Sequence, residues 1–392
     1  SVSAQHTLDV TEQKQSKATT SISLDLDDSK PGAPNKTQTE NRYPDRGRTI
    51  SIPLIHADQH RINPVNPLPA SGVHKNEDGL VLENTATRPD QIFASIDAPS
   101  QMIAALVDEL SAKYPKLEQS VLNRLAVAAT YVAVDIPLMV AAHEMGHGSE
   151  VHHTDPSSNP EVVMTGWMGG YTRYNLAENT SDMESLMITV AGMNQATYNG
   201  EEVQRRMHTE GADLKDAIGY LVNITNSVNY QIKDWAQNNP AGFDDAASYH
   251  AVMEARDKGW NQQNLSVLSL GVNLINADFW ASLIGSVNYI ATGEQVRMPE
   301  IQMGQNHLSL PHFSITHGYE GPQMNVSVFG HRNTPATLEF KYAQILTPDN
   351  GPALGIETRL HNLAIPGTQK QLTVSPRIGL STHNQSLGFK AG

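Results

Sequence analysis

The chain has 392 residues and a formal net charge of −14, a length that permits two or three domains with a substantial core. The negative charge, without any cluster of lysine or arginine, excludes nucleic-acid binding as the main function. Because cysteine is absent, a disulfide framework and a thiolate metal site are also excluded.

The first 92 residues are poor in side chains that build a core. No aromatic residue precedes Tyr43 and no phenylalanine precedes Phe93, so the segment buries too little apolar surface to offset the entropy of ordering it. We expect residues 1–92 to form a disordered or extended arm, with 50–55 as a local strand or docking peptide. The start at Ser1 resembles a mature end left after removal of a leader, which suggests the bacterial cell envelope, periplasm or outer membrane.

From about Pro99 the pattern becomes helical. Apolar residues at three- and four-residue spacing predict an amphipathic helix that ends near Tyr114. In the next run, 121–142, either Asp135 caps a new helix with Pro137 in its first turn, or one long helix bends at the proline. Further runs with few charges complete a helical domain expected over 93–298; they are 185–200, 217–232 and 261–292.

These apolar runs suggest either the buried core of a helical domain or a set of membrane helices. The run 261–292 is long enough for the roughly 20 residues that cross a bilayer, but the shorter runs carry Asn, Ser or Thr. The mean hydropathy of the whole chain is −0.39. We therefore favour a helical domain that is soluble or membrane-associated over one that spans the membrane.

After Met298 the sequence changes to short alternating segments separated by turns rich in glycine, proline and asparagine. Strands are expected at 307–317, 324–329, 336–345, 353–360 and 371–380. They predict an antiparallel β meander over 299–392, as a sandwich or a small barrel. The fold class is therefore α+β, with a helical domain, then an antiparallel β domain, and a long irregular N-terminal arm.

The clearest chemical signal is a His-Glu-x-x-His motif formed by His143, Glu144 and His147. On a helix the two histidines lie one turn apart on one face, where they can bind one metal ion, and Glu144 can hold an attacking water. This is the geometry of a zinc hydrolase; a buried helix with hydrogen-bonded histidines is the alternative. A catalytic zinc normally has three protein ligands, so a third remains to be found.

Two resemblances imply different third ligands. The stretch from His143 to Met164 resembles the metzincin signature, which implies His153, although Glu150 stands where that family has a glycine. The segment that begins at Glu178 and ends at Asp182 is similar to the Glu-x-x-x-Asp pattern of gluzincins. That resemblance implies Glu178 as the third ligand.

A third resemblance, to the site-2-protease-like metallopeptidases, covers roughly residues 121–293. It is carried by four features in order: the apolar helix with the His-Glu-x-x-His motif, Gly169-Gly170-Tyr171, Ala191-Gly192-Met193-Asn194, and a late apolar helix with Asn273 and Asp278. It implies that Asp278 completes the zinc site and that Asn194 lies near the substrate carbonyl. The prolines and glycine that flank the late aspartate of that family are absent around Asp278.

An argument from the residues also favours Asp278 over His153 and Glu178. It is the one acid in a run of about 30 residues without other charges. A lone acid there is costly to bury unless it is paired or bound to a metal.

The expected function is a zinc-dependent metallopeptidase that cleaves a protein or peptide substrate. Zn²⁺ held by His143, His147 and Asp278 would activate a water, Glu144 would act as general base, and Asn194 could stabilise the oxyanion. Further candidate donors are Tyr171, Tyr220 and Tyr230.

Other expected partners are a membrane and proteins that bind the N-terminal arm and the β domain, but no nucleic acid. The alternative function is a non-catalytic cell-envelope scaffold or outer-membrane complex subunit with a structural or vestigial metal site.

Overall fold

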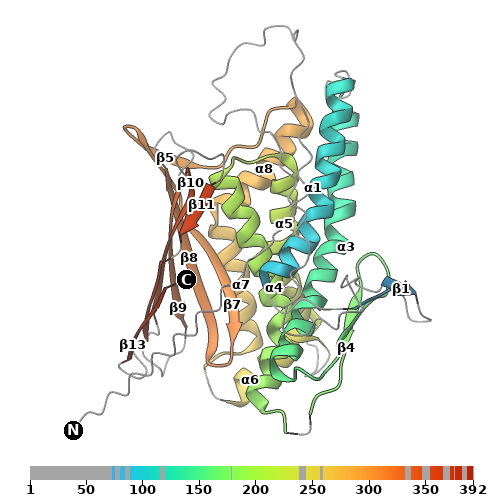
Figure 1. The fold of residues 1–392 in the computed structure, drawn as a ribbon, viewed down its shortest axis with the longest axis vertical. Coiled ribbons are helices and arrows are strands. Elements are labelled where there is room, and N and C mark those ends of the chain that lie inside the picture. Colours follow the sequence, from blue (N-terminus) through green and yellow to red (C-terminus); the bar gives the residue numbers. More distant parts are fainter. Residues whose placement is uncertain are drawn as a thin grey trace, which may run out of the picture.

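The computed structural model describes residues 73–75, 80–83, 89–114, 120–177, 179–237, 244–256, 259–331, 337–346, 354–364, 371–374, 376–381 and 386–391. Within these ranges the protein is α+β, with seven helices and two antiparallel sheets (Figure 1). The predicted fold class is confirmed. Most of the segment expected to form an arm, including residues 50–55, lies outside the described residues.

The described helices form an elongated bundle (Figure 1). They are α1 (Pro89–Lys113), α3 (Val121–Thr154), α4 (Asp182–Thr209), α5 (Leu214–Gln237), α6 (Asp245–Ala255), α7 (Gln262–Ile275) and α8 (Ala277–Thr292). Helix α3 is continuous through Pro137, so Asp135 does not begin a new helix. Its carboxylate instead accepts a hydrogen bond from Ser100 of α1 at 2.8 Å.

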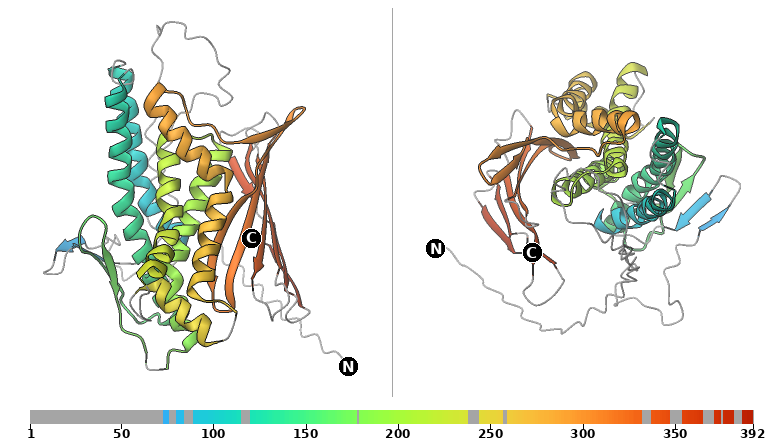
Figure 2. Two further views of the ribbon diagram at one scale, coloured as in Figure 1. Left: turned by 180° about the vertical axis from the view of Figure 1, so that it is seen from behind. Right: turned by 90° about the horizontal axis from the view of Figure 1, so that it is seen from above.

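Helices α4 and α5 lie in the middle of the bundle, with α3 on one side and the large sheet on the other (Figure 2). The crossing of α3 and α4 is close at Gly146, where a Cβ atom would lie 2.7 Å from the carbonyl oxygen of Ala191. Charged groups join the helices from inside, since Asp97 of α1 binds Arg206 at 2.8 Å and Lys215 at 3.0 Å.

The large sheet contains nine strands in the order β13-β12-β10-β9-β8-β6-β5, with β7 beside β8 and β11 beside β10. The strands are β5 (Glu300–Met303), β6 (Asn306–Ser309), β7 (His312–Gly318), β8 (Gly321–His331), β9 (Thr337–Ile345), β10 (Leu354–Ala364), β11 (Gln371–Val374), β12 (Pro376–Ser381) and β13 (Ser386–Ala391). Because β5 and β13 do not pair with each other among the described strands, the predicted meander is one open sheet and not a closed barrel.

The small sheet has the order β1-β2-β3-β4. It consists of β1 (Val73–Lys75), β2 (Leu80–Glu83), β3 (Glu161–Met164) and β4 (Gly170–Arg173). Strand β2 pairs with β3, for example at Leu82 and Val162, so part of the expected N-terminal arm belongs to this sheet. Strand β4 is its edge and packs beside α3.

Two parts of the described bundle are long and apolar enough to cross a bilayer. Helix α3 meets this criterion by itself, and α7 and α8 meet it together as a pair bent by 61°.

Candidate metal centre

Three side chains converge where α3, α4 and α6 meet. Nε2 of His143 lies 2.8 Å from Oδ2 of Asp245, Nε2 of His147 lies 3.1 Å from the same oxygen, and the two Nε2 atoms are 3.3 Å apart. It is the one group of three metal-binding side chains found among the described residues. These three side chains can therefore hold a metal ion.

The hydrogen bonds behind the two rings orient them for this role. Nδ1 of His143 lies 3.2 Å from Oδ1 of Asn226, and Nδ1 of His147 lies 2.7 Å from the carbonyl oxygen of Ile188. In its neutral form each ring then carries its hydrogen on Nδ1 and directs the lone pair of Nε2 toward Asp245. Two lone pairs and a carboxylate oxygen repel one another, so a metal ion or a proton must lie between them. Burial lowers the pKa of His147, but Asp245 raises it overall to about 9, so a proton on Nε2 holds this place when no metal is bound.

The spacing of the three atoms also fits a metal. Nitrogen and oxygen ligands lie about 2.0–2.2 Å from a tetrahedral zinc, which places ligand atoms about 3.3–3.5 Å from one another. The observed separations of 2.8–3.3 Å need only a small expansion.

Packing fixes the position of both imidazoles. The ring of Tyr230 on α5 stacks on His143, with centroids 5.0 Å apart and planes at 4°. On the other helix, Gly192 faces both rings, and a Cβ atom there would lie 2.5 Å from Nε2 of His147. The site therefore requires a glycine at this position of α4.

Asp245 stands in the first turn of α6. The neighbouring Asp244 is the N-cap and accepts a hydrogen bond from the backbone N–H of Ala247 at 2.8 Å, so the two adjacent acids have different tasks. Burial alone would raise the pKa of Asp245, but the charge of protonated His147 and hydrogen bonds from His143 and His147 hold it well below its usual range. The carboxylate is thus ionised, as a metal ligand must be.

Glu144 is buried beside this group. The hydroxyl of Thr172 on β4 lies 3.0 Å from its Oε2 and 2.7 Å from its carbonyl oxygen. Gly170 lets β4 approach, because a Cβ atom there would lie 3.0 Å from Cγ of Glu144. Edge strand β4 therefore fixes the carboxylate that was predicted to act as the base.

Asp278 is not part of this group, which corrects its assignment as the third ligand. Its Oδ2 accepts a hydrogen bond from Gln204 at 2.7 Å and lies 3.0 Å from Nε2 of His208. The argument that a buried acid needs a partner was sound, but the partners are these two side chains of α4. Among the described residues, the acid that lies beside His143 and His147 is Asp245 and not Asp278.

The other two candidate ligands do not join the described group. His153 is exposed at the end of α3, and Glu178 lies outside the described residues. Since α3 remains helical through Glu150, the chain does not turn back after His147. Six residues of helix rotate His153 by about 240° away from the face that carries His147.

Asn194, predicted to stabilise an oxyanion, is occupied elsewhere. Its Nδ2 donates to the carbonyl oxygen of His317 at 2.8 Å, and its Oδ1 accepts from the backbone N–H of the same residue at 2.7 Å. It thus binds the edge of β7, and neither end of its amide is directed to the metal group.

One local sequence signal accompanies Asp245. Pro240 and Gly242 are followed by Asp244 and Asp245, a pattern of turn residues and acids that predicts the start of a helix. No comparable signal marks Asn226, because an isolated asparagine in an apolar helix is common.

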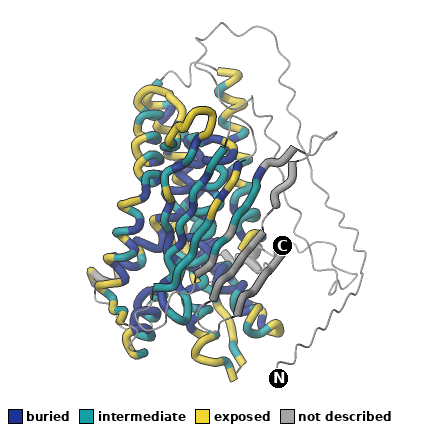
Figure 3. Tube along the Cα trace, turned by 90° about the vertical axis from the view of Figure 1, so that its left-hand side faces the viewer, coloured by how far each residue is buried: buried dark blue, intermediate teal, exposed yellow. Residues whose placement is uncertain are grey.

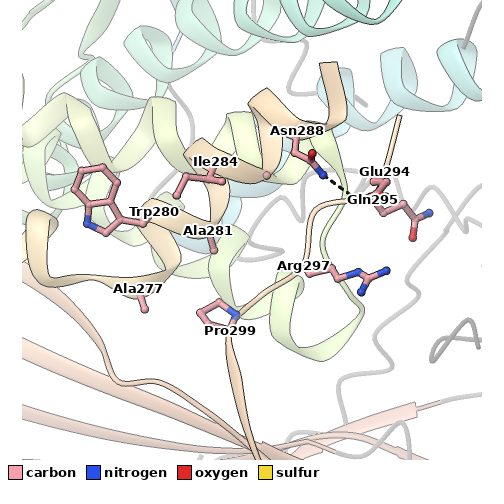
Figure 4. A pocket seen from close by; sticks show the side chains of 10 residues that line it. Ala277, Trp280, Ala281, Ile284, Asn288, Glu294, Gln295, Arg297 and Pro299 are labelled. Carbon is pink, nitrogen blue, oxygen red and sulfur yellow. Dashed lines mark hydrogen bonds between the residues drawn. The ribbon is translucent and has the colours of Figure 1, made fainter. Parts of the chain in front are cut away.

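A separate groove of about 590 Å³ lies on the surface of α8 (Figure 4). Its lining residues all belong to α8 and the segment that follows, and they include Trp280, Ile284 and Arg297. None of them belongs to the metal group.

No family model, no curated protein and no solved structure matches this chain. The function must therefore be inferred from the geometry of the metal group.

Proposed function

We propose that the protein is a zinc-dependent metallopeptidase whose metal is held by His143, His147 and Asp245. The main support is the convergence of two Nε2 atoms and one carboxylate oxygen within 3.3 Å. Three nitrogen and oxygen ligands leave one position open for water, as in catalytic zinc sites, whereas structural sites close with four ligands.

When bound, the metal would supply a water of lowered pKa and a positive charge for the scissile carbonyl. Glu144 would accept the proton of that water and return it to the leaving amine. The hydroxyl of Thr172, which also contacts the carbonyl oxygen of Glu144, lies 3.0 Å from Oε2 of this carboxylate and would help to orient it. The side chain of Asp245 is 22% exposed, and we expect water and substrate to reach the site from this side.

The choice of third ligand can be tested by metal analysis. We expect the purified protein supplied with zinc to bind about one ion per chain, and Asp245→Asn to lose it. Asp278→Asn is the matched control, because it removes a buried acid that also contacts a histidine and should retain the metal. If Asp278→Asn loses the zinc and Asp245→Asn retains it, Asp278 is the third ligand. If the wild-type protein binds no zinc, the proposal is wrong.

Catalysis is tested separately with Glu144→Gln. This variant should keep its zinc but hydrolyse peptides about 10²–10⁴-fold more slowly, since it lacks the general base. Digests of a peptide library followed by mass spectrometry measure this difference. If the wild type binds zinc and cleaves no member of the library, the non-catalytic scaffold becomes the better explanation.

A further inference from the structure

Among the described strands, the large sheet has a mainly polar face inside and a mainly apolar face outside, with Phe329 as an apolar exception on the inner face. Buried residues of β8 and β9, such as Ser327 and Glu339, face the helices. They alternate with apolar residues that face away, and of these Leu338 and Phe340 are 48% and 43% exposed. Figure 3 shows buried residues alternating with less buried ones along strands of this sheet. A sheet of a water-soluble protein has the opposite polarity.

The inner polar side chains find their partners on α4. Glu201 forms an ion pair with Lys341 of β9 and accepts a hydrogen bond from Ser314 of β7. Its neighbour Glu202 lies 3.7 Å from Arg359 of β10. These contacts fix which face of the sheet meets the bundle, so the apolar face must point away from it.

Helices α3, α7 and α8 also expose apolar side chains, while α3 and α8 bury acidic residues. On α7 and α8, Val267, Ile284 and Val287 are 59–63% exposed, and Ile284 also lines the groove of Figure 4. Asp278, an acid on α8, is buried. On α3, Leu122 and other apolar side chains are exposed while Asp135 is buried.

The apolar faces have the dimensions of a bilayer. The 34 residues of α3 extend about 51 Å, more than the roughly 30 Å of a hydrocarbon layer. Strands β8, β9 and β10 contain 11, 9 and 11 residues, and a tilted strand crosses this layer with about 9–11.

Strand β7 meets a further requirement of a membrane, because its backbone groups are bound by side chains of the helices. Asn276 binds both N–H and C=O of Phe313 at 2.6 Å. Asn194 binds both groups of His317, and the hydroxyl of Thr197, shared with the carbonyl oxygen of Met193, lies 3.3 Å from that of Ile315. An unsatisfied backbone group in hydrocarbon costs several kcal/mol, and the two asparagines remove that cost at Phe313 and His317.

We infer that strands β7–β10 lie in the same bilayer as α3 and α7–α8, with the outward face of the sheet against lipid acyl chains. Seen from above, the sheet and α3 lie on opposite sides of the molecule (Figure 2). A protein partner would have to surround it to cover both, whereas a bilayer does so directly. Edge strand β13 pairs only with β12 among the described strands, so the inference is confined to the central strands.

This inference is independent of the metal centre, and the absence of cysteine makes it testable with single labels. The full chain is reconstituted into phosphatidylcholine vesicles with a bimane fluorophore on Val328→Cys or Phe340→Cys, which pair on the outward face. The matched control is Ser327→Cys, the inward neighbour of Val328. Val287→Cys reports on α8.

Brominated acyl chains should quench the fluorophore several-fold more strongly at Val328 and Phe340 than at Ser327, and as strongly as at Val287. Aqueous iodide should quench none of these positions. Iodide quenching at both outward positions, with lipid quenching at Val287 retained, would overturn the inference. The inference would also be overturned if neither brominated lipid nor iodide quenched the fluorophore at Val328 and Phe340, because protein would then cover the sheet. Each variant must keep the wild-type circular dichroism spectrum to be counted.

Discussion

At the scale of single residues, the metal centre depends on the smallest side chain near it. Gly192 packs against both imidazoles, and a Cβ atom there would lie 2.6 Å from Nε2 of His143 and 2.5 Å from Nε2 of His147. Neither ring can withdraw freely, because Tyr230 stacks on His143 and Nδ1 of His147 is bonded to the backbone. An added methyl group must therefore displace one of the two imidazoles.

We expect Gly192→Ala to weaken zinc binding by at least about 10–100-fold, comparable to the loss of an orienting contact. Gly200→Ala on the same helix is the control, because its Cβ atom would meet nothing closer than 3.6 Å. It should bind zinc normally and gain about 0.5–1 kcal/mol in helix stability. Competition titration with a zinc chelator measures both variants. Equal affinities would show that the rings can adapt.

The sequence could predict the local part of this site but not its distant part. His143, Glu144 and His147 follow from one helical turn, so their spacing alone places them together. Asp245 comes from another helix, and the choice between it and Asp278 depends on tertiary packing. The sequence shows that a buried acid needs a partner but does not show that His208 is the partner of Asp278.

At the scale of elements, β7 shows how helices can replace a neighbouring strand. Polar side chains of α4 and of the α7–α8 junction contact alternate residues of its backbone, namely Phe313, Ile315 and His317. Alternation in the sequence predicted the strands near β8 and β9, because period two is a local property. It could not predict which face meets the helices, nor the pairing of β2 with β3 from the segment expected to be an arm.

Asn276→Leu should destabilise the protein by about 2–4 kcal/mol, because it leaves the buried N–H and C=O of Phe313 without partners. Asn288→Leu on α8 is the control, since its amide makes a bond of 3.2 Å to Glu294 at the surface, and its effect should stay within about 0.5 kcal/mol. Thermal unfolding gives the stability, and hydrogen exchange of the peptide 312–318 should accelerate only in Asn276→Leu. Unchanged exchange there would mean that another group protects the strand.

At the scale of the whole molecule, the bundle and the large sheet are joined by polar groups. The sequence divides cleanly near residue 298, which led us to expect a separate β domain. In the structure, however, the inner face of the sheet finds charged partners on α4, such as Glu201 for Lys341. Without the helices, the polar groups of this inner face would lack hydrogen-bond and ion-pair partners. We therefore expect the helical bundle and the large sheet to unfold as one unit.

Double-mutant analysis of Glu201 and Lys341 tests this coupling. Their side chains are 15% and 20% exposed, so either single alanine variant should lose about 2 kcal/mol by leaving a half-buried charge unpaired. The double variant should lose at least about 1 kcal/mol less stability than the sum of the losses of the two single variants, since it leaves no unpaired charge.

Arg205→Ala is the control, because its partner Glu202 lies on the same helix. The helix and strand signals should melt together in every variant, whereas additive losses or separate transitions would show that the sheet is an independent domain.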